Sequence, residues 1–484
     1  MNNQQIANKK VLSGLFWRYG ERMCAQGVQF IVSVILARLL TPESYGYVGL
    51  VTVFISIATV FVQSGFGNAL IQKKDATQKD FSSVFYFNIA FSLLLFLALQ
   101  LIAPVIASFY DAGELLTPVI RILSFSVILA GINNVQQAFV SRKMIFKKFF
   151  YATLLGTICS AFAGIIAAYH GLGVWALVIQ QLTNQAIDTI ILWITVRWRP
   201  SCEISLHSLK TLFTFGWKLL FSNLIDTLYN NIYSLIIGKY YNSAALGYYN
   251  RGKNIPNLVI TNVNSSIQSV LFPAYAKEQD NLTRVKQMVS RSIKVSTFLI
   301  FPCMAGLAAI AHSLTVVLLT EKWEPCVIFM QYCCFIYAFW PIHTSNLQAI
   351  SAIGRSDIYL RLEVIKKILG IIILFCTLPF GLEVMMIGRC LNTIIASILN
   401  AFPNQKLFQY SFKEQVRDIL PNALLSIVMG LSISFINYLN ISSIFKLCIQ
   451  IPGGILVYII CAKLFNVESY QYLLNTMNIF SKRN

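Results

Sequence analysis

The sequence predicts an all-α polytopic membrane protein with about 14 transmembrane helices, because apolar segments long enough to cross ~30 Å of hydrocarbon follow one another along it. Hydrophobic residues make up 56% of the 484-residue chain and charged residues 12%, and the mean hydropathy is +0.65. A soluble protein of this composition would expose large apolar patches to water. The chain is therefore expected to work within or across a bilayer.

The apolar segments leave little room for anything else. In chain order they lie near residues 14–39, 45–66, 81–108, 116–140, 149–169, 174–196, 212–240, 254–272, 293–319, 326–350, 358–380, 382–402, 416–439 and 442–464. Each helix with its loop occupies roughly 35 residues, so no separate soluble domain is predicted. The first segment is too long and too charged for a cleavable signal, and we interpret it as a retained helix.

The positive charges are concentrated in the loops on one side of the predicted membrane. Loops on the side of the N-terminus hold 30 of the 38 Lys and Arg residues. The opposite loops hold only Arg38, Lys239, Arg251, Lys253, Lys322 and Lys446. This asymmetry follows the positive-inside rule and predicts cytoplasmic termini and an even number of helices. The basic loops contact anionic lipid in this interpretation, so no nucleic-acid partner is expected.

An internal repeat predicts two halves. Residues 37–47 resemble residues 238–248 at an offset of 201, with Gly-Tyr at 46–47 and again at 247–248. A weaker similarity relates Gln137, Ala138 and Arg142 to Gln348, Ala349 and Arg355. Both similarities would be explained by two parallel six-helix lobes, an N-terminal lobe at 1–205 and a C-terminal lobe at 206–405. Two additional transmembrane helices and a cytoplasmic tail would then occupy 406–484. Chance similarity between two loops is the alternative.

Polar residues recur on single faces of several predicted helices. Such residues are costly in hydrocarbon and usually face a bundle interior or an aqueous cavity. The candidates to line a central cavity are Arg18, Arg22, Arg121, Asn223, Asn230, Arg251, Lys253, Asn257, Asn264 and Arg389. Structural alternatives exist for several of them: an interfacial ion pair of Arg18 and Arg22 with Glu21, an ion pair of Arg121, and interhelical hydrogen bonds of the amides.

Carboxylates within the helices are few. Glu21 and Asp226 are the candidates to bind a coupling cation, either a proton or sodium, and ion pairs with neighbouring helices are the alternative. Asp188 is the third such carboxylate. The cysteines and histidines show no metal-ligand spacing, and no catalytic motif or cofactor is predicted.

Cations and amides in one cavity suit a substrate with an anionic part and a hydroxyl-rich part. Arginine matches phosphate oxygens, and amide side chains match sugar hydroxyls. A sugar attached to a lipid through pyrophosphate would satisfy both requirements.

Several segments resemble a known family. They are residues 35–46, 65–72, 237–249, 271–275 and 352–357, which include the run Ala37-Arg38-Leu39-Leu40-Thr41-Pro42. They are similar to the polysaccharide-transport, Wzx-like branch of the multidrug/oligosaccharidyl-lipid/polysaccharide flippase superfamily, whose members act in lipopolysaccharide and exopolysaccharide biosynthesis.

The resemblance implies flipping of an undecaprenyl-pyrophosphate-linked oligosaccharide across the bacterial inner membrane by alternating access. It also implies an ion gradient or membrane potential as the energy source, no enzyme activity, and a polysaccharide polymerase and glycosyltransferases as partners. One alternative is a small-molecule or drug antiporter of the same superfamily. Another is a membrane enzyme such as a glycan polymerase.

Overall fold

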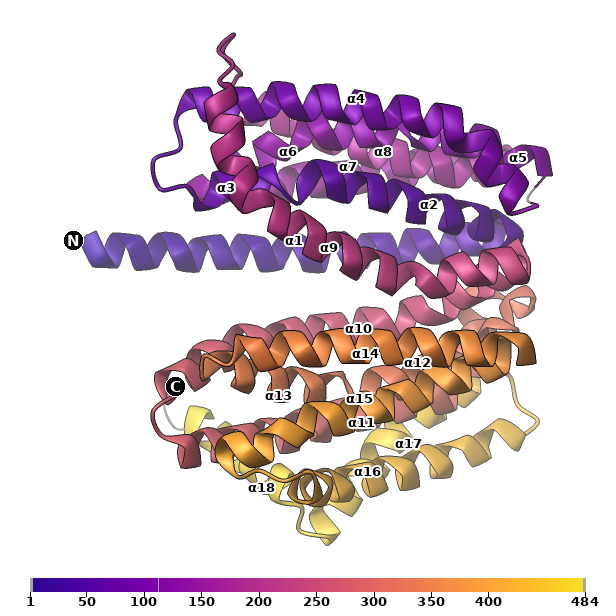
Figure 1. The fold of residues 1–484 in the computed structure, drawn as a ribbon. Coiled ribbons are helices and arrows are strands. Elements are labelled where there is room, and N and C mark those ends of the chain that lie inside the picture. Colours follow the sequence, from indigo (N-terminus) through magenta and orange to yellow (C-terminus); the bar gives the residue numbers. More distant parts are fainter. Residues whose placement is uncertain (1–2, 112, 482–484) are drawn as a thin grey trace. The chain divides into compact units, whose positions relative to one another are not determined.

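The computed structural model describes the backbone of residues 3–111 and 113–481, and within these ranges helices joined by loops are present and no strand is (Figure 1). The chain divides into two compact units, the first ending at Gly247 and the second beginning at Tyr248. The division into lobes at 1–205 and 206–405 with additional helices at 406–484 stays a prediction, because it rests on the sequence repeat and not on packing.

The described residues of the first unit form nine helices and the start of a tenth. They are α1 (Asn3–Leu39), α2 (Pro42–Gln63), α3 (Phe66–Gln72), α4 (Gln78–Phe109), α5 (Gly113–Leu123), α6 (Phe125–Lys143), α7 (Lys147–Tyr169), α8 (Val174–Thr195), α9 (Leu206–Tyr240) and the beginning of α10 (Ser243–Lys277). Helix α7 packs along α8 and α1, and α6 packs against α4 and α8. Phe81, Phe85, Phe149 and Trp198 belong to one buried apolar core among these helices.

The second unit continues α10 and adds the remaining helices. They are α11 (Leu282–Leu319), η1 (Glu321–Trp323), α12 (Cys326–Ala338), α13 (Trp340–Ala352), α14 (Ser356–Thr377), η2 (Leu378–Phe380), α15 (Leu382–Phe408), α16 (Phe412–Ser434), η3 (Phe435–Tyr438), α17 (Ser443–Leu464) and α18 (Glu468–Ser481). Helix α11 is central, because α12, α13, α16, α17 and α18 all pack against it.

The predicted all-α membrane fold is confirmed, although the number of spans is not. Within the described residues, nine helical segments are long and apolar enough to cross a membrane. The other five predicted segments are also helical, as α1, α8, α9, α10 and α14, each at least 22 residues long. Polar residues within them lower their hydropathy. The count of fourteen therefore stays a prediction.

Prolines have different effects on the helices of the second unit. Helices α10 and α11 run through Pro256 and Pro302. A break does occur near Pro341, between α12 and α13. In α11 the missing N–H of Pro302 frees the carbonyl of Phe298. The hydroxyl of Tyr458 in α17 donates a 2.9 Å hydrogen bond to that carbonyl, so the helix continues without a bare acceptor.

The two segments of the sequence repeat adopt the same local structure. The side chain of Thr41 accepts a hydrogen bond from the amide of Ser44 at the start of α2. The side chain of Asn242, 201 positions later, accepts one from the amide of Ala245 at the start of α10. Both are N-terminal caps, which satisfy backbone donors that have no partner within the helix.

These segments also meet through two glycines. A Cβ on Gly46 would overlap the backbone of Ser243, and a Cβ on Gly247 would overlap the carbonyl of Pro42. The two contacts are reciprocal, because adding 201 to the numbers of Gly46 and Pro42 gives Gly247 and Ser243. Only residues without a Cβ allow the two backbones to approach this closely.

Candidate functional site

A cluster of cationic and aromatic side chains lies in the second unit. Arg389 of α15 donates a 2.6 Å hydrogen bond from Nη1 to the hydroxyl of Tyr249 in α10. Lys253 Nζ lies 6.0 Å from the centroid of the Tyr249 ring. The Arg251 guanidinium lies over the Trp323 ring, 5.6 Å from its centroid. We call Arg389, Tyr249 and Lys253 the cationic cluster, and the pair of Arg251 and Trp323 lies beside it in sequence on α10.

Close helix packing holds the cluster in place. A Cβ on Gly252 would lie 2.6 Å from the carbonyl oxygen of Cys326, so α10 approaches the backbone of α12 directly. The Tyr249 ring meets Phe329 of α12 edge to face at 6.2 Å between centroids. Tyr249 is fully buried, and Arg251, two positions later in α10, is also buried. The rings of Tyr249 and Trp323 therefore shield the cations that they contact from hydrocarbon.

Two predicted site residues, Lys253 and Arg389, thus come together at Tyr249, while Arg251 lies on the same helix against Trp323. Asn264, another candidate on α10, accepts a 2.7 Å hydrogen bond from the hydroxyl of Thr344 in α13. This is the interhelical bond that the sequence analysis left open for the amides. Asn257 is half-buried on the same helix.

The candidates in the first unit are distributed differently. Asn223 and Asp226 are half-buried on α9 and Asn230 is exposed there, whereas Arg121 is exposed on α5. Helix α9 packs mainly against α2, α3 and α4, and α5 packs mainly against α2, α4 and α8. Their packing therefore does not gather these residues into one cluster. The side chains of Arg18, Glu21 and Arg22 lie outside the described residues.

A polar cluster among α6, α7 and α8 was not assigned from the sequence. The carboxylate of Asp188 accepts a 2.8 Å hydrogen bond from the amide of Asn133, whose own oxygen is buried without a hydrogen bond. One turn earlier, Asn184 donates to the hydroxyl of Ser160 at 3.2 Å. The signal was present as isolated polar residues in apolar segments, but one helix alone does not show that they face one another.

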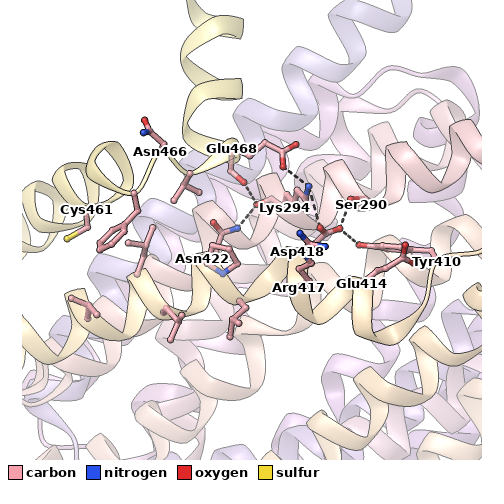
Figure 2. A pocket seen from close by; sticks show the side chains of 18 of the residues that line it. Ser290, Lys294, Tyr410, Glu414, Arg417, Asp418, Asn422, Cys461, Asn466 and Glu468 are labelled. Atoms are coloured by element: carbon pink, nitrogen blue, oxygen red, sulfur yellow. Dashed lines mark hydrogen bonds and ion pairs between the residues drawn. The ribbon is translucent and has the colours of Figure 1, made fainter.

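A second feature that the sequence analysis missed is a pocket of about 860 Å³ among α11, α16, α17 and α18 (Figure 2). Lys294, Asp418 and Glu468 lie at one end of it, and apolar side chains of α16 and α17 line the rest.

The motif Gly354-Arg355-Ser356-Asp357 has a local structural role. The Arg355 guanidinium donates two 2.9 Å hydrogen bonds to the carboxylate of Asp357 at the start of α14. This interaction lowers the pKa of the Asp357 carboxyl to about 2. A negative charge in the first turn also interacts favourably with the helix dipole.

Comparison with known proteins identifies the family. A family model described as polysaccharide biosynthesis protein matches residues 35–328, more than half of the chain. The chain belongs to this family. The resemblance drawn from the sequence is thereby confirmed.

Curated relatives match this chain over most of its length. The teichuronic acid biosynthesis protein TuaB of Bacillus subtilis (strain 168) is 26% identical over 459 residues, covering 93% of this chain and 95% of that protein. The lipopolysaccharide biosynthesis protein WzxC of Escherichia coli (strain K12) is 23% identical over 401 residues, covering 81% and 80%.

Solved structures show the same fold. A lipid II flippase, MurJ, in an inward closed conformation matches with a TM-score of 0.72 at 17% identity, covering 96% of this chain and 100% of that chain. An inward-facing multidrug resistance transporter of the MATE family matches with a TM-score of 0.59 at 16% identity, covering 78% and 94%. The chain is thus a multi-pass membrane protein with the fold of the MOP superfamily.

Proposed function

We propose that this protein flips an undecaprenyl-pyrophosphate-linked oligosaccharide across the bacterial inner membrane for surface polysaccharide biosynthesis. The observation that carries the proposal is the cationic cluster in a member of a polysaccharide biosynthesis family. Two cations gathered at one tyrosine within a membrane protein are costly unless they serve a function. Arg389 and Lys253 offer the donors that phosphate oxygens bind well.

Movement of such a substrate requires alternating access. The reciprocal contacts of Gly46 and Gly247 support a closing point where the two repeat segments meet. Each contact is a direct approach of two backbones, so a small separation breaks both together. In this proposal the contacts are intact in one state and broken in the other, with both termini in the cytoplasm as the charge distribution predicts.

Flipping of this kind needs no covalent step, and the proposed activity is therefore not enzymatic. Glycosyltransferases would act before the flipping step, and a polysaccharide polymerase would act after it. A drug antiporter of the same fold is the second candidate. The names of the curated relatives favour the polysaccharide substrate, since both describe polymer biosynthesis.

The coupling cation would bind a carboxylate within the helices. Asp226 and Glu21 stay candidates, and Asp188 joins them because it lies within the helices and accepts a hydrogen bond from the amide of Asn133. The amide oxygen of that same Asn133 side chain is buried without a hydrogen bond, and ionisable groups within membrane helices commonly serve proton or ion pathways.

The proposal is tested by leaflet-resolved analysis of lipid-linked glycans in a strain that lacks this protein. An impermeant glycosidase distinguishes the two leaflets, and mass spectrometry identifies the glycan. Accumulation of one pyrophosphate-linked glycan in the inner leaflet supports flipping. Expression of the wild-type protein should remove this accumulation, whereas expression of Arg389→Ala at equal membrane abundance should not. An unchanged glycolipid pool together with altered drug sensitivity would favour the antiporter.

Coupling is tested separately in proteoliposomes. Asp188→Asn should abolish the dependence of flipping on a proton or sodium gradient, whereas Asp75→Asn, which removes an exposed loop carboxylate of the same unit, should preserve it. Gradient-dependent flipping by Asp188→Asn would eliminate this residue and leave Asp226 and Glu21.

A further inference from the structure

The pocket among α11, α16, α17 and α18 changes character along its length. Its charged end is built from α11, the first turns of α16 and the start of α18 (Figure 2). Its other end is walled by apolar residues of α16 and α17. Helices α11, α16 and α17 are long and apolar enough to span a membrane, so this polar-to-apolar change is expected near a membrane surface.

The charged end is an alternating network. Lys294 Nζ lies 3.3 Å from Asp418 and 2.7 Å from Glu468, and Lys286 Nζ lies 2.8 Å from Glu414. Arg417 is the third cation that lines the pocket. The described pocket lining therefore contains three cations and three carboxylates. It presents both signs of charge and no net excess of either.

The apolar end forms a track along two helices. Leu420, Leu424 and Val428 recur every four residues on α16 and are about half exposed. Cys461 of α17 and Phe465, the residue that follows its last turn, have the same spacing. Residues four apart lie on one helix face, so both helices present an apolar strip that leads away from the charged end.

We propose that this pocket binds a membrane phospholipid with a zwitterionic, ammonium-bearing headgroup, such as phosphatidylethanolamine. The acyl chains lie along the strips of α16 and α17. The phosphate accepts hydrogen bonds from Arg417 and Lys286, and the headgroup ammonium donates to Glu414.

Charge balance selects this class of lipid. An anionic headgroup gains attraction from the three cations of the lining but is repelled by its three carboxylates. A zwitterionic headgroup places one charge against each sign. The volume of about 860 Å³ accommodates a headgroup and the adjoining part of the acyl chains.

The bound lipid would stabilise the docking of the C-terminal helices. Helix α18 already contacts α11 through the hydroxyl of Ser469, which donates to the Lys294 carbonyl at 3.2 Å. Arg291 of α11 also stacks on the Tyr472 ring at 3.6 Å from its centroid. A lipid between α16 and α17 extends these contacts, and this role does not depend on which glycan the protein moves.

The test uses the purified full-length protein incubated with vesicles of palmitoyl-oleoyl phosphatidylethanolamine or of the matching phosphatidylglycerol, followed by native mass spectrometry. Wild type should retain phosphatidylethanolamine in preference to phosphatidylglycerol. Arg417→Ala should reduce that retention about tenfold, since a hydrogen bond to a charged group is lost. Leu424→Trp should also reduce it, because the larger side chain fills the apolar strip.

Matched controls lie on the same helix outside the pocket. Lys413→Ala removes an exposed cation, and Leu431→Trp changes a leucine that is 61% exposed, so both should retain the lipid as wild type does. If Leu424→Trp fails to fold, Arg417→Ala decides alone.

Equal or stronger retention of phosphatidylglycerol would overturn the proposal, as would unchanged retention by Arg417→Ala. Displacement of the phospholipid by undecaprenyl phosphate would also overturn it, by assigning the pocket to the transported lipid. Retention is measured without flipping, so its failure is distinguishable from failure of the proposed function.

Discussion

The reciprocal glycine contacts make the substitution Gly247→Ala informative. Its added Cβ would lie 2.9 Å from the carbonyl carbon of Pro42 and 3.3 Å from the amide nitrogen of Gly46. Carbon atoms in ordinary contact are about 3.5–4.0 Å apart, so the two segments must separate by roughly 1 Å. Overpacking of this kind costs about 1–3 kcal/mol, which would lower the population of the closed contact about 5- to 150-fold.

Hydrogen exchange measured by mass spectrometry checks this directly. Peptides covering residues 41–47 and 242–248 should exchange faster in Gly247→Ala by a factor in that range. Because the contacts are reciprocal, Gly46→Ala should accelerate exchange in the same two peptides. Gly453→Ala is the matched control, since a Cβ there meets nothing within 4 Å.

Exchange like that of wild type in both peptides of Gly247→Ala would refute the expected separation. A change confined to the peptide that carries the substitution would also refute it, because a reciprocal contact must release both segments. Faster exchange across α16 as well would indicate general destabilisation and would refute a local effect.

Three further predictions concern the second unit. Gly252→Ala should lower the unfolding temperature by an amount corresponding to about 1–3 kcal/mol, because its Cβ would lie 2.6 Å from the Cys326 carbonyl oxygen; a thermal unfolding curve like that of Gly453→Ala would contradict this. Tyr249→Phe keeps the ring but removes the acceptor of Arg389, a loss of about 1.5–3 kcal/mol for a hydrogen bond to a charged group. It should reduce glycan flipping in the leaflet assay at unchanged membrane abundance, and full activity would show that this hydrogen bond is dispensable. The ion pair at the start of α14 predicts a pH dependence, because the Asp357 pKa is lowered to about 2 from an ordinary value of 3.8. Its stabilisation is present above pH 3.8 and is lost as the pH falls through about 2, so the difference in unfolding temperature between wild type and Asp357→Asn should shrink over that window and stay constant above it.

Much of the fold could be predicted from hydropathy because each membrane helix satisfies its own backbone hydrogen bonds. The predicted segments all correspond to helices. The effect of proline was harder to predict, since it depends on neighbouring helices. Pro302 leaves α11 continuous because Tyr458 supplies a donor 156 positions away in sequence.

The site was predicted only as a set of separate residues. Arg251, Lys253 and Arg389 were identified by their cost in hydrocarbon, but the meeting of Arg389 with Tyr249 joins α15 to α10 across 140 positions of sequence. The polar group around Asp188 and the pocket among α11, α16, α17 and α18 were missed for the same reason. Each helix contributes only one strip, and a single strip does not identify its partner.

The hydrogen bond from Tyr458 to Phe298 has a consequence for biosynthesis. The carbonyl and its donor are 160 residues apart, so at about 5–20 residues per second the ribosome needs roughly 8–32 s to produce the donor after the acceptor has been made. During that interval Tyr458 is not available to the Phe298 carbonyl. A chain truncated before Ser443 lacks this donor altogether, so the hydrogen bonding of α11 is completed only after α17 has been made.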